Sequence, residues 1–243
     1  MSQVDQLVQK ATEGIQARPI LPFGTTLRLG DVGVVGRSQN WEPRGTAGSL
    51  LATRVGRSNE GSRANWSITS GNEVGISALA RGEASTLFPK APKASARVEI
   101  SFGSAESFLL SVRDLHVLTL ANPAALITAM LKAFGRGTWR REYVLVYQLV
   151  IPRYSLILLS KHADSSFLLT AKAKAAVQGG SADLAGNVRL TYQNKDAVNL
   201  DAGRQPLFFN GYRVKPDWWG KKGTVETLGL RDEDPEDVLF DRI

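Results

Sequence analysis

The chain has 243 residues, of which 43% are hydrophobic and 22% are charged, a composition typical of a folded globular protein rather than a disordered one. It contains no cysteine, which excludes a disulfide scaffold, a thiol nucleophile, a cysteine metal site and cysteine acylation. The net charge of +7 favours a polyanionic partner, either nucleic acid or an anionic lipid surface.

The first part of the chain alternates between short elements and loops. Apolar residues recur at helical spacing over residues 4–16, which predicts an amphipathic helix that ends before Pro19. The segment Thr25–Val35 predicts one or two strands, broken by glycines whose spacing matches no nucleotide-binding fingerprint. A further short element is expected within Ala47–Val55, in a stretch that otherwise has the composition of a loop.

Alternating strands come next. Trp66–Leu79 is interpreted as a strand, and residues 84–96, with their prolines and lysines, as a linker or mobile loop. The apolar residues Val98, Ile100 and Phe102 alternate with polar ones, which predicts a strand with one apolar face. A strand over residues 108–112 is the expected partner of this one.

The middle of the chain contains its best helix and its most apolar stretch. Pro123–Phe134 has helical periodicity, with Asn122 as a plausible N-cap and glycines after its end. The stretch Tyr143–Leu159 is rich in leucine, β-branched and aromatic residues and is interrupted by Pro152. It predicts two buried strands separated at the proline.

The segment Phe167–Tyr192 predicts a hairpin. Apolar and polar residues alternate on both sides of a loop that contains glycines, which is typical of two antiparallel strands. The apolar face of the first strand is mostly alanine, and its other face carries Lys172 and Lys174. Such a strand fits an ordinary surface hairpin, and it also fits a membrane strand with lipid on one side and water on the other. One more strand is expected over Leu207–Val214.

The charge is uneven along the chain. Residues 231–243 contain two arginines and six acids, which gives them a net charge of −4. Because the whole chain carries +7, residues 1–230 carry +11. An acidic end on a basic body is either a solvated tail or a segment that lies on the basic surface and masks it.

No pattern points to catalysis, a metal or a cofactor. The two histidines, His116 and His162, are far apart in sequence and have no other ligands at metal-binding spacing. His162, Asp164 and Ser165 lie close together in sequence, but short loops often contain these residue types. These absences remove the specific reasons to propose an enzyme, and we predict that the chain is not one.

The order of these segments resembles the bacterial gasdermins, pore-forming relatives of the animal cell-death proteins. The resemblance covers about residues 16–230 and rests on several weak signals rather than on one diagnostic motif. It is carried by the segments Leu27–Arg37, Trp66–Leu79, Ala96–Phe102, Pro123–Phe134, Tyr143–Ile151, Ser166–Lys174, Gly186–Tyr192 and Pro206–Val214.

The resemblance implies an α+β fold, a twisted and mostly antiparallel sheet with peripheral helices. It further implies a pore-forming domain over residues 1–230 and a short autoinhibitory tail over residues 231–243. Cleavage near the tail would free the basic body to oligomerise, and two stretches would refold into hairpins of a large membrane β-barrel. Gasdermin pores kill the bacterial cell as a defence against phage. The implied location is the cytoplasm before activation and the inner membrane after it.

The implied hairpins combine Trp66–Leu79 with Ser95–Gly103 and Phe167–Ala176 with Asn187–Asn194. Their candidate membrane residues are Trp66, Ile68, Val98, Ile100, Phe102, Phe167, Leu169, Ala171, Ala173, Val188, Leu190 and Tyr192.

The implied partners are an activating protease, an anionic membrane and further copies of the chain. Candidate cleavage positions are Leu230 and Arg231 for a trypsin-like protease, and Asp232, Asp234 or Asp237 for a caspase-like one. The tail residues Val238, Leu239 and Phe240 are candidates for docking on the body. Many bacterial members carry a lipid-modified N-terminal cysteine that this chain lacks, so inhibition by the tail alone or a different form of regulation is implied.

Two other functions fit the same residues. A basic nucleic-acid-binding module would use the positive body and tryptophans such as Trp41 and Trp218 for phosphate contacts and stacking, although no nucleic-acid-binding motif frames them. A β-rich structural or interaction protein would form stable oligomers that are indifferent to proteolysis.

Overall fold

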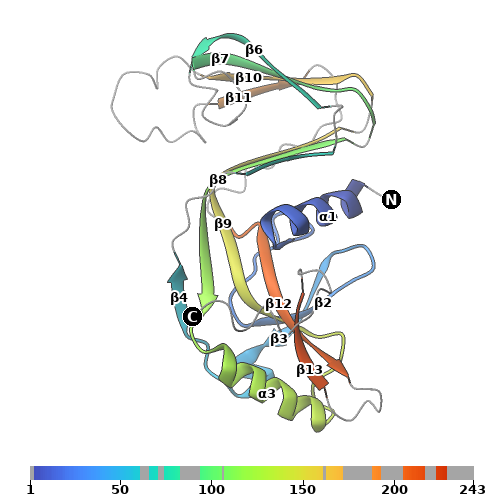
Figure 1. Ribbon diagram of the computed structural model, residues 1–243, viewed down its shortest axis with the longest axis vertical. Helices are drawn as coiled ribbons and strands as arrows, with labels where there is room; N and C mark the ends of the chain where they lie inside the picture. The colour runs from blue at the N-terminus through green and yellow to red at the C-terminus, as the bar shows by residue number, and fades with distance from the viewer. Residues whose placement is uncertain are drawn as a thin grey trace. The chain divides into compact units, whose positions relative to one another are not determined.

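A computed structural model describes residues 3–60, 66–70, 74–82, 94–105, 107–160, 163–171, 188–192, 205–216 and 223–228 (Figure 1). The chain divides into two compact units. The first comprises Met1–Leu7, Ser62–Leu115 and Pro152–Gln205. The second comprises Val8–Gly61, His116–Ile151 and Pro206–Ile243.

Three helices occur in the described residues. The helix α1 (Gln3–Ile15) confirms the amphipathic helix expected near the N-terminus, and its apolar side chains Leu7 and Ala11 are buried. The short helix α2 (Ala47–Leu51) begins with a capping box between Thr46 and Ser49. The helix α3 (Pro123–Gly135) confirms the best helix of the sequence.

The predicted cap of α3 is only partly correct. Asn122 occupies the N-cap position, but its side chain makes no hydrogen bond to the first turn. Its Nδ2 atom instead donates to the carbonyl oxygen of Arg54 at 3.4 Å, so the side chain contacts the chain segment before β4 rather than the helix.

The larger sheet has nine strands, which form antiparallel pairs wherever their register is defined. Its main path is β1-β12-β9-β2-β3, while β8 pairs with β4, β5 and β9, and β13 pairs with β12. The strands are β1 (Arg18–Pro19), β2 (Asp31–Val35), β3 (Trp41–Thr46), β4 (Arg57–Glu60), β5 (Trp66–Thr69), β8 (Phe108–Leu120), β9 (Val144–Leu159), β12 (Phe208–Pro216) and β13 (Gly223–Leu228).

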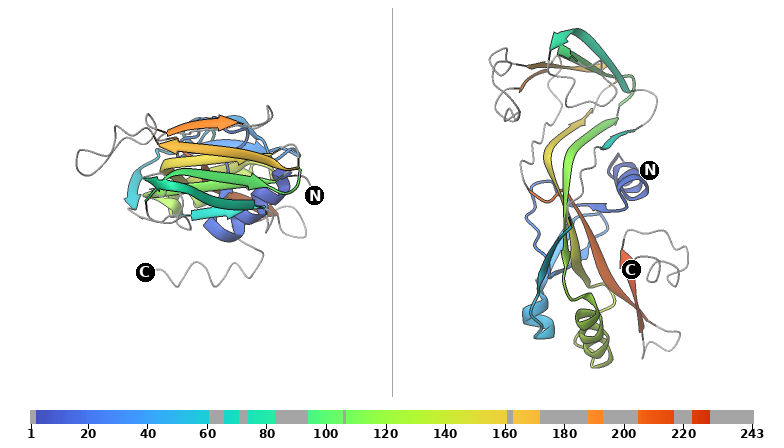
Figure 2. Two further views of the ribbon diagram at one scale, coloured as in Figure 1. Left: turned by 90° about the horizontal axis from the view of Figure 1, so that it is seen from above. Right: turned by 60° about the vertical axis from the view of Figure 1, so that its left-hand side comes forward.

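The smaller sheet has four antiparallel strands in the order β11-β10-β7-β6 (Figures 1 and 2). They are β6 (Val74–Gly82), β7 (Ala94–Phe102), β10 (Ser165–Ala171) and β11 (Val188–Tyr192). All four belong to the first unit. Two antiparallel sheets with few helices confirm the predicted α+β class.

Three strand predictions need correction. Trp66–Leu79 forms two strands rather than one, β5 and β6. The strand that begins at Phe108 pairs with β5 and not with the alternating strand β7. Within Thr25–Val35, the strand Asp31–Val35 runs through Gly33, where a break was predicted. Periodicity identified apolar faces in these regions, but the choice of partner depends on contacts between distant segments.

The predicted break at Pro152 is also wrong, because β9 runs without interruption from Val144 to Leu159. The pairing of β9 with β12 extends from Val144 to Val150. Pro152 lies beyond that last pair, so its missing N–H removes no hydrogen bond to β12.

The second unit has an apolar core in which α3 packs against β12 and β13 (Figure 1). Leu126 and Met130 of α3 are fully buried in one cluster with Leu145 of β9. A second cluster contains Trp41 and Phe209, whose rings meet edge to face at 5.3 Å.

A row of hydrogen-bonded polar side chains, Asn210, Gln148 and Thr119, crosses three strands beside this core. Asn210 of β12 is buried, and its Nδ2 atom donates to Gln148 Oε1 at 2.8 Å and to the carbonyl oxygen of Gln16 at 2.9 Å. Gln148 Nε2 of β9 in turn donates to Thr119 Oγ1 of β8 at 3.4 Å. The row ties the end of α1 to the sheet at the bulge between Asn210 and Gly211.

Replacing either of two glycines of the second unit by alanine is expected to change the free energy of unfolding, in opposite directions at the two positions. A Cβ atom on Gly33 would overlap the Trp41 ring and lie 2.5 Å from the carbonyl oxygen of Glu42, whereas one on Gly135 would meet nothing within 4 Å. We expect Gly33→Ala to lower the free energy of unfolding by about 1–3 kcal/mol. Gly135→Ala should raise it by roughly 0.5 kcal/mol, because alanine favours the helix. Urea unfolding of both variants tests this, and equal midpoints would contradict the packing around Gly33.

Candidate functional site

The predicted hairpin of residues 167–192 is confirmed as a strand pair. β10 and β11 are antiparallel, and their register pairs Phe167 with Tyr192 and Leu169 with Leu190. Ala171 pairs with Val188 at the end of the described ladder. Ala173, Lys172 and Lys174 lie outside the described residues.

Part of the first implied hairpin coincides with an antiparallel strand pair in this structure, β6 and β7. Their register pairs Val74 with Phe102 and Ile76 with Ile100. Trp66 and Ile68, which were candidates for this hairpin, are instead in β5, where they pair with Val112 and Leu110 of β8.

The two hairpins are joined into one sheet by the pairing of β7 with β10, which the sequence analysis did not anticipate. Phe167 pairs with Ile100, and Leu169 pairs with Val98. Because paired positions share a face, the apolar positions form continuous rows across the strands. These rows are Val74–Phe102, Ile76–Ile100–Phe167–Tyr192, Ala78–Val98–Leu169–Leu190 and Ala171–Val188. The first row continues to Ser165 of β10, which is a polar exception. We call these positions the apolar face. The alternation of apolar and polar residues in each of the four strands indicates that each has an apolar face. It does not indicate which strands are neighbours.

The opposite face consists mainly of polar positions. One row contains Ser77, Glu99 and Thr191, and another contains Arg97, Thr170 and Arg189, while Leu168 in the first row and Ala80 in the second are apolar.

The two faces differ in burial where side chains are described. Ile100 and Phe102, on the apolar face, are both 0% exposed. Ser101, between them on the opposite face, is exposed, and Glu99 and Ser166 are half-buried. Val74, a third position of the apolar face, is half-buried, so the face is covered at Ile100 and Phe102.

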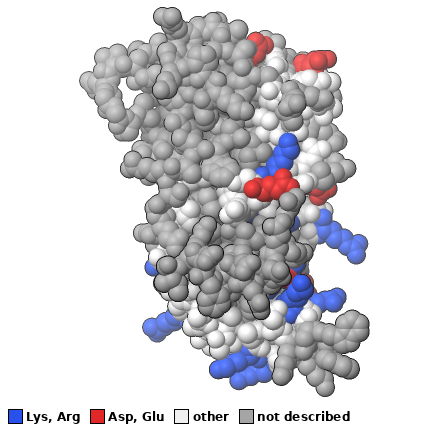
Figure 3. Space-filling view, in the orientation of Figure 1, with Lys and Arg blue, Asp and Glu red and all other residues white. Residues whose placement is uncertain are grey.

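The second unit carries a group of basic side chains on β1 and β12. Arg18 is largely buried, and its guanidinium donates to Gln39 Oε1, while its Nε atom has no acceptor among the described residues. Burial lowers the pKa of Arg18, and the nearby charge of Arg213 lowers it further. Arg213 and Lys215 share one carboxylate, that of Glu226, with Lys215 Nζ at 3.8 Å. On the face shown in Figure 3, the described Lys and Arg side chains are scattered rather than gathered in one patch.

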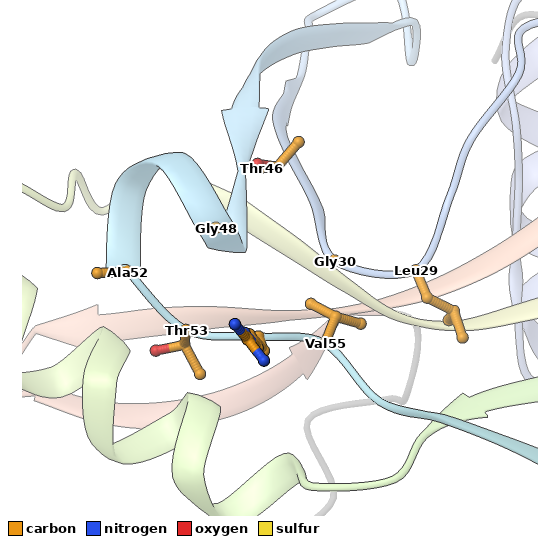
Figure 4. Close-up of a pocket in the computed structure, with 8 residues that line it drawn as sticks. Leu29, Gly30, Thr46, Gly48, Ala52, Thr53 and Val55 are labelled. Atoms are coloured by element: carbon orange, nitrogen blue, oxygen red, sulfur yellow. The ribbon is translucent and has the colours of Figure 1, made fainter.

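A shallow pocket of about 480 Å³ lies beside α2 in the second unit (Figure 4). Its wall combines glycines and small residues with Leu29, Val55 and the charged Arg54. The hydroxyls that line it are engaged locally, since Thr46 Oγ1 accepts from the N–H of Ser49 and Thr53 Oγ1 donates to the carbonyl oxygen of Leu51. Arg54 is the one charged residue among the described ones that line this pocket, so it offers no acid–base pair.

The remaining candidate residues are at the C-terminus or near His162. The tail candidates Leu230, Arg231, Asp232, Asp234, Asp237, Val238, Leu239 and Phe240 lie outside the described residues, as does His162. Within the described ranges, no helix has the length and apolarity needed to cross a membrane. The same ranges contain no cluster of three side chains suited to holding a metal ion.

The burial of Ile100 leads to a prediction about stability. Ile100→Ala removes fully buried methyl groups, and we expect it to lower the free energy of unfolding by about 2–5 kcal/mol. The matched control is Ser101→Ala on the exposed face of the same strand, which should change it by less than about 0.5 kcal/mol. Chemical unfolding of the two variants measures the difference, and an Ile100 variant as stable as the control would mean that the face is not packed.

Comparison with protein families and with curated proteins gives no match to this chain. Among solved structures, the chain is similar to a bacterial gasdermin from Bradyrhizobium tropiciagri, with 14% sequence identity and a TM-score of 0.35. The similarity covers 93% of this chain and 90% of that chain.

Proposed function

We propose that this chain is a membrane pore-forming protein whose hairpins β6–β7 and β10–β11 enter the bilayer. The observation that carries the proposal is the apolar face, which extends in register across all four strands. A strand in a membrane pore needs one lipid-facing and one water-facing side, and this sheet has one apolar and one mainly polar side.

The lengths of β6 and β7 support insertion, while the described parts of β10 and β11 are shorter, at 7 and 5 residues. β6 and β7 have 9 residues each. A tilted transmembrane strand needs about 9–11 residues. Among the described strands, the four-stranded sheet ends at β6 and β11, so it has two open edges there. Because unpaired backbone groups are too costly in lipid, several copies would have to join edge to edge and close into a barrel.

The charge distribution supports control by the tail. Residues 231–243 carry −4 and the body carries +11, so the tail on the body would weaken its attraction to anionic lipid. Each well-placed basic residue near such a surface contributes roughly 1 kcal/mol. In this proposal, a protease cuts near Leu230 to Asp237, and the freed body moves from the cytoplasm to the inner membrane. The resulting pore kills the cell, as an antiviral defence, without enzymatic activity of its own.

The first prediction concerns activation. We expect a chain ending at Leu230 to release dye from anionic liposomes, and the full-length chain to release little, because the acidic tail is absent only from the first. Neutral liposomes are the control and should stay intact, since the basic body depends on anionic lipid for binding. If both forms stay monomeric and neither causes leakage, the pore-forming function is wrong, and salt-dependent nucleic-acid binding is the next function to test.

The second prediction concerns the two faces of β10. Leu169→Arg places a charge at an apolar-face position, at a cost of about 2–4 kcal/mol per chain near the middle of the bilayer. Thr170→Arg adds the same charge at the neighbouring position of the opposite face. We expect dye release to be lost in the first variant and kept in the second. Circular dichroism of both full-length variants establishes that each is folded, and equal leakage would contradict insertion of this face.

A further inference from the structure

Three basic side chains, Arg18, Arg213 and Lys215, lie along β12 in the second unit. β9 occupies one edge of β12, so β1 and β13 follow each other along the other edge. Arg18 of β1 pairs with Phe209, and Glu226 of β13 pairs with Arg213. Paired positions share a face of the sheet, and so do alternate positions of one strand. The three basic residues and Glu226 are therefore on the same face.

The row of positions between Arg18 and Arg213 has no polar side chain. It consists of Leu228, Gly211 and Val146, which are paired across β13, β12 and β9. Val146 is fully buried, and Leu228 packs against the same apolar cluster. The two arginines therefore border an apolar row from opposite sides, with no described polar side chain of the sheet in the row that separates them.

Arg18 has a buried donor that no described residue satisfies. Its guanidinium donates to the side-chain oxygen of Gln39, which is neutral, while its Nε atom has no acceptor among the described residues. Gln39 lies in the turn between β2 and β3, where its N–H donates to the carbonyl oxygen of Gly36 at 2.9 Å. Leaving a buried cationic donor without an acceptor is costly, so this position favours an anion.

The charges around Arg18 are also unbalanced. Arg213 and Lys215 both contact the carboxylate of Glu226, whereas none of the described carboxylates contacts Arg18. Burial lowers the pKa of Arg18, and the charge of Arg213 lowers it further. Both effects mean that the protonated guanidinium is disfavoured where it lies. An anion held between the two guanidinium groups would offset both effects.

We propose that Arg18 and Arg213 form a binding site for a phosphate group, which lies over Leu228 and accepts hydrogen bonds from both guanidinium groups. A guanidinium presents its donors in a plane, a geometry that suits the oxygens of phosphate. Arg213 contacts Glu226 through Nε, and its Nη groups donate to none of the described residues. They therefore remain available to a ligand. Binding needs no membrane, so the site is independent of the proposed pore.

Calorimetric titration of the full-length chain with inorganic phosphate tests the site. We expect one phosphate per chain. Arg213→Gln should weaken binding about ten-fold or more, because it removes hydrogen bonds to a charged group. Sodium chloride at the same ionic strength is the control for screening.

The matched control variant is Arg44→Gln. Arg44 and Arg213 each have a side chain that is 44% exposed, and each contacts one glutamate. Arg44 belongs to β3, however, so its replacement removes the same charge and leaves both arginines of the proposed site in place. We expect this variant to bind phosphate as tightly as the natural chain.

Thermal unfolding gives an independent measurement. At a phosphate concentration ten-fold above the dissociation constant, the unfolding midpoint of the natural chain and of Arg44→Gln should rise by about 3–6 °C. The midpoints of Arg213→Gln and Arg18→Gln should stay within about 1 °C under the same conditions. If Arg18→Gln does not fold, Arg213→Gln still tests the site, because that side chain is partly exposed.

Two further titrations identify the source of the anion. Glycerol phosphate in place of inorganic phosphate shows whether the site accepts an esterified phosphate, as in a lipid headgroup. A full-length chain with Asp232→Asn, Glu233→Gln and Asp234→Asn shows whether carboxylates of residues 231–243 compete with phosphate.

Each outcome decides for or against the site. Binding of either phosphate compound that Arg213→Gln weakens and Arg44→Gln does not supports the site. Such binding only in the chain with the three amide substitutions also supports it, with a carboxylate of the same chain as the competing occupant. If no phosphate compound binds to either full-length chain, or if the two arginine variants bind equally, the proposal is wrong.

Discussion

The structure depends on one antiparallel register between two distant parts of the chain, residues 94–120 and 144–171. This register pairs β7 with β10 and β8 with β9, and the connections between them have equal length. It keeps the two hairpins adjacent in the small sheet and gives the large sheet two of its strands. Because side chains alternate with a period of two, a slip of one residue would move the apolar positions to the opposite face.

The apolar face has to satisfy two environments. In the conformation described here, Ile100 and Phe102 are fully buried, so this part of the face is shielded from water. In the proposed pore, the same positions would face lipid, which is as apolar as the protein interior. The same residues therefore suit both states. The difference in free energy between the described conformation and the proposed pore depends on what covers the apolar face and on how the sheet edges are paired.

The interior of the second unit differs from the apolar face, because its contacts favour one particular pairing of strands. The polar row through Asn210, Gln148 and Thr119 has specific hydrogen-bond partners, and the glycine at position 33 leaves room only for the Trp41 ring. Buried polar groups of this kind strongly favour one strand pairing, because any other would leave them without partners.

The sequence by itself determined which segments are amphipathic. The periods of α1, α3, β7, β10 and β11 are visible in the residues, because local alternation fixes which side of an element is apolar. Only the tertiary structure decided the partners. It split Trp66–Leu79 into two strands of different sheets, carried β9 through Pro152 and placed β7 beside β10. These features depend on hydrogen bonds between residues far apart in the chain, and local patterns contain no information about which distant edge a strand will meet.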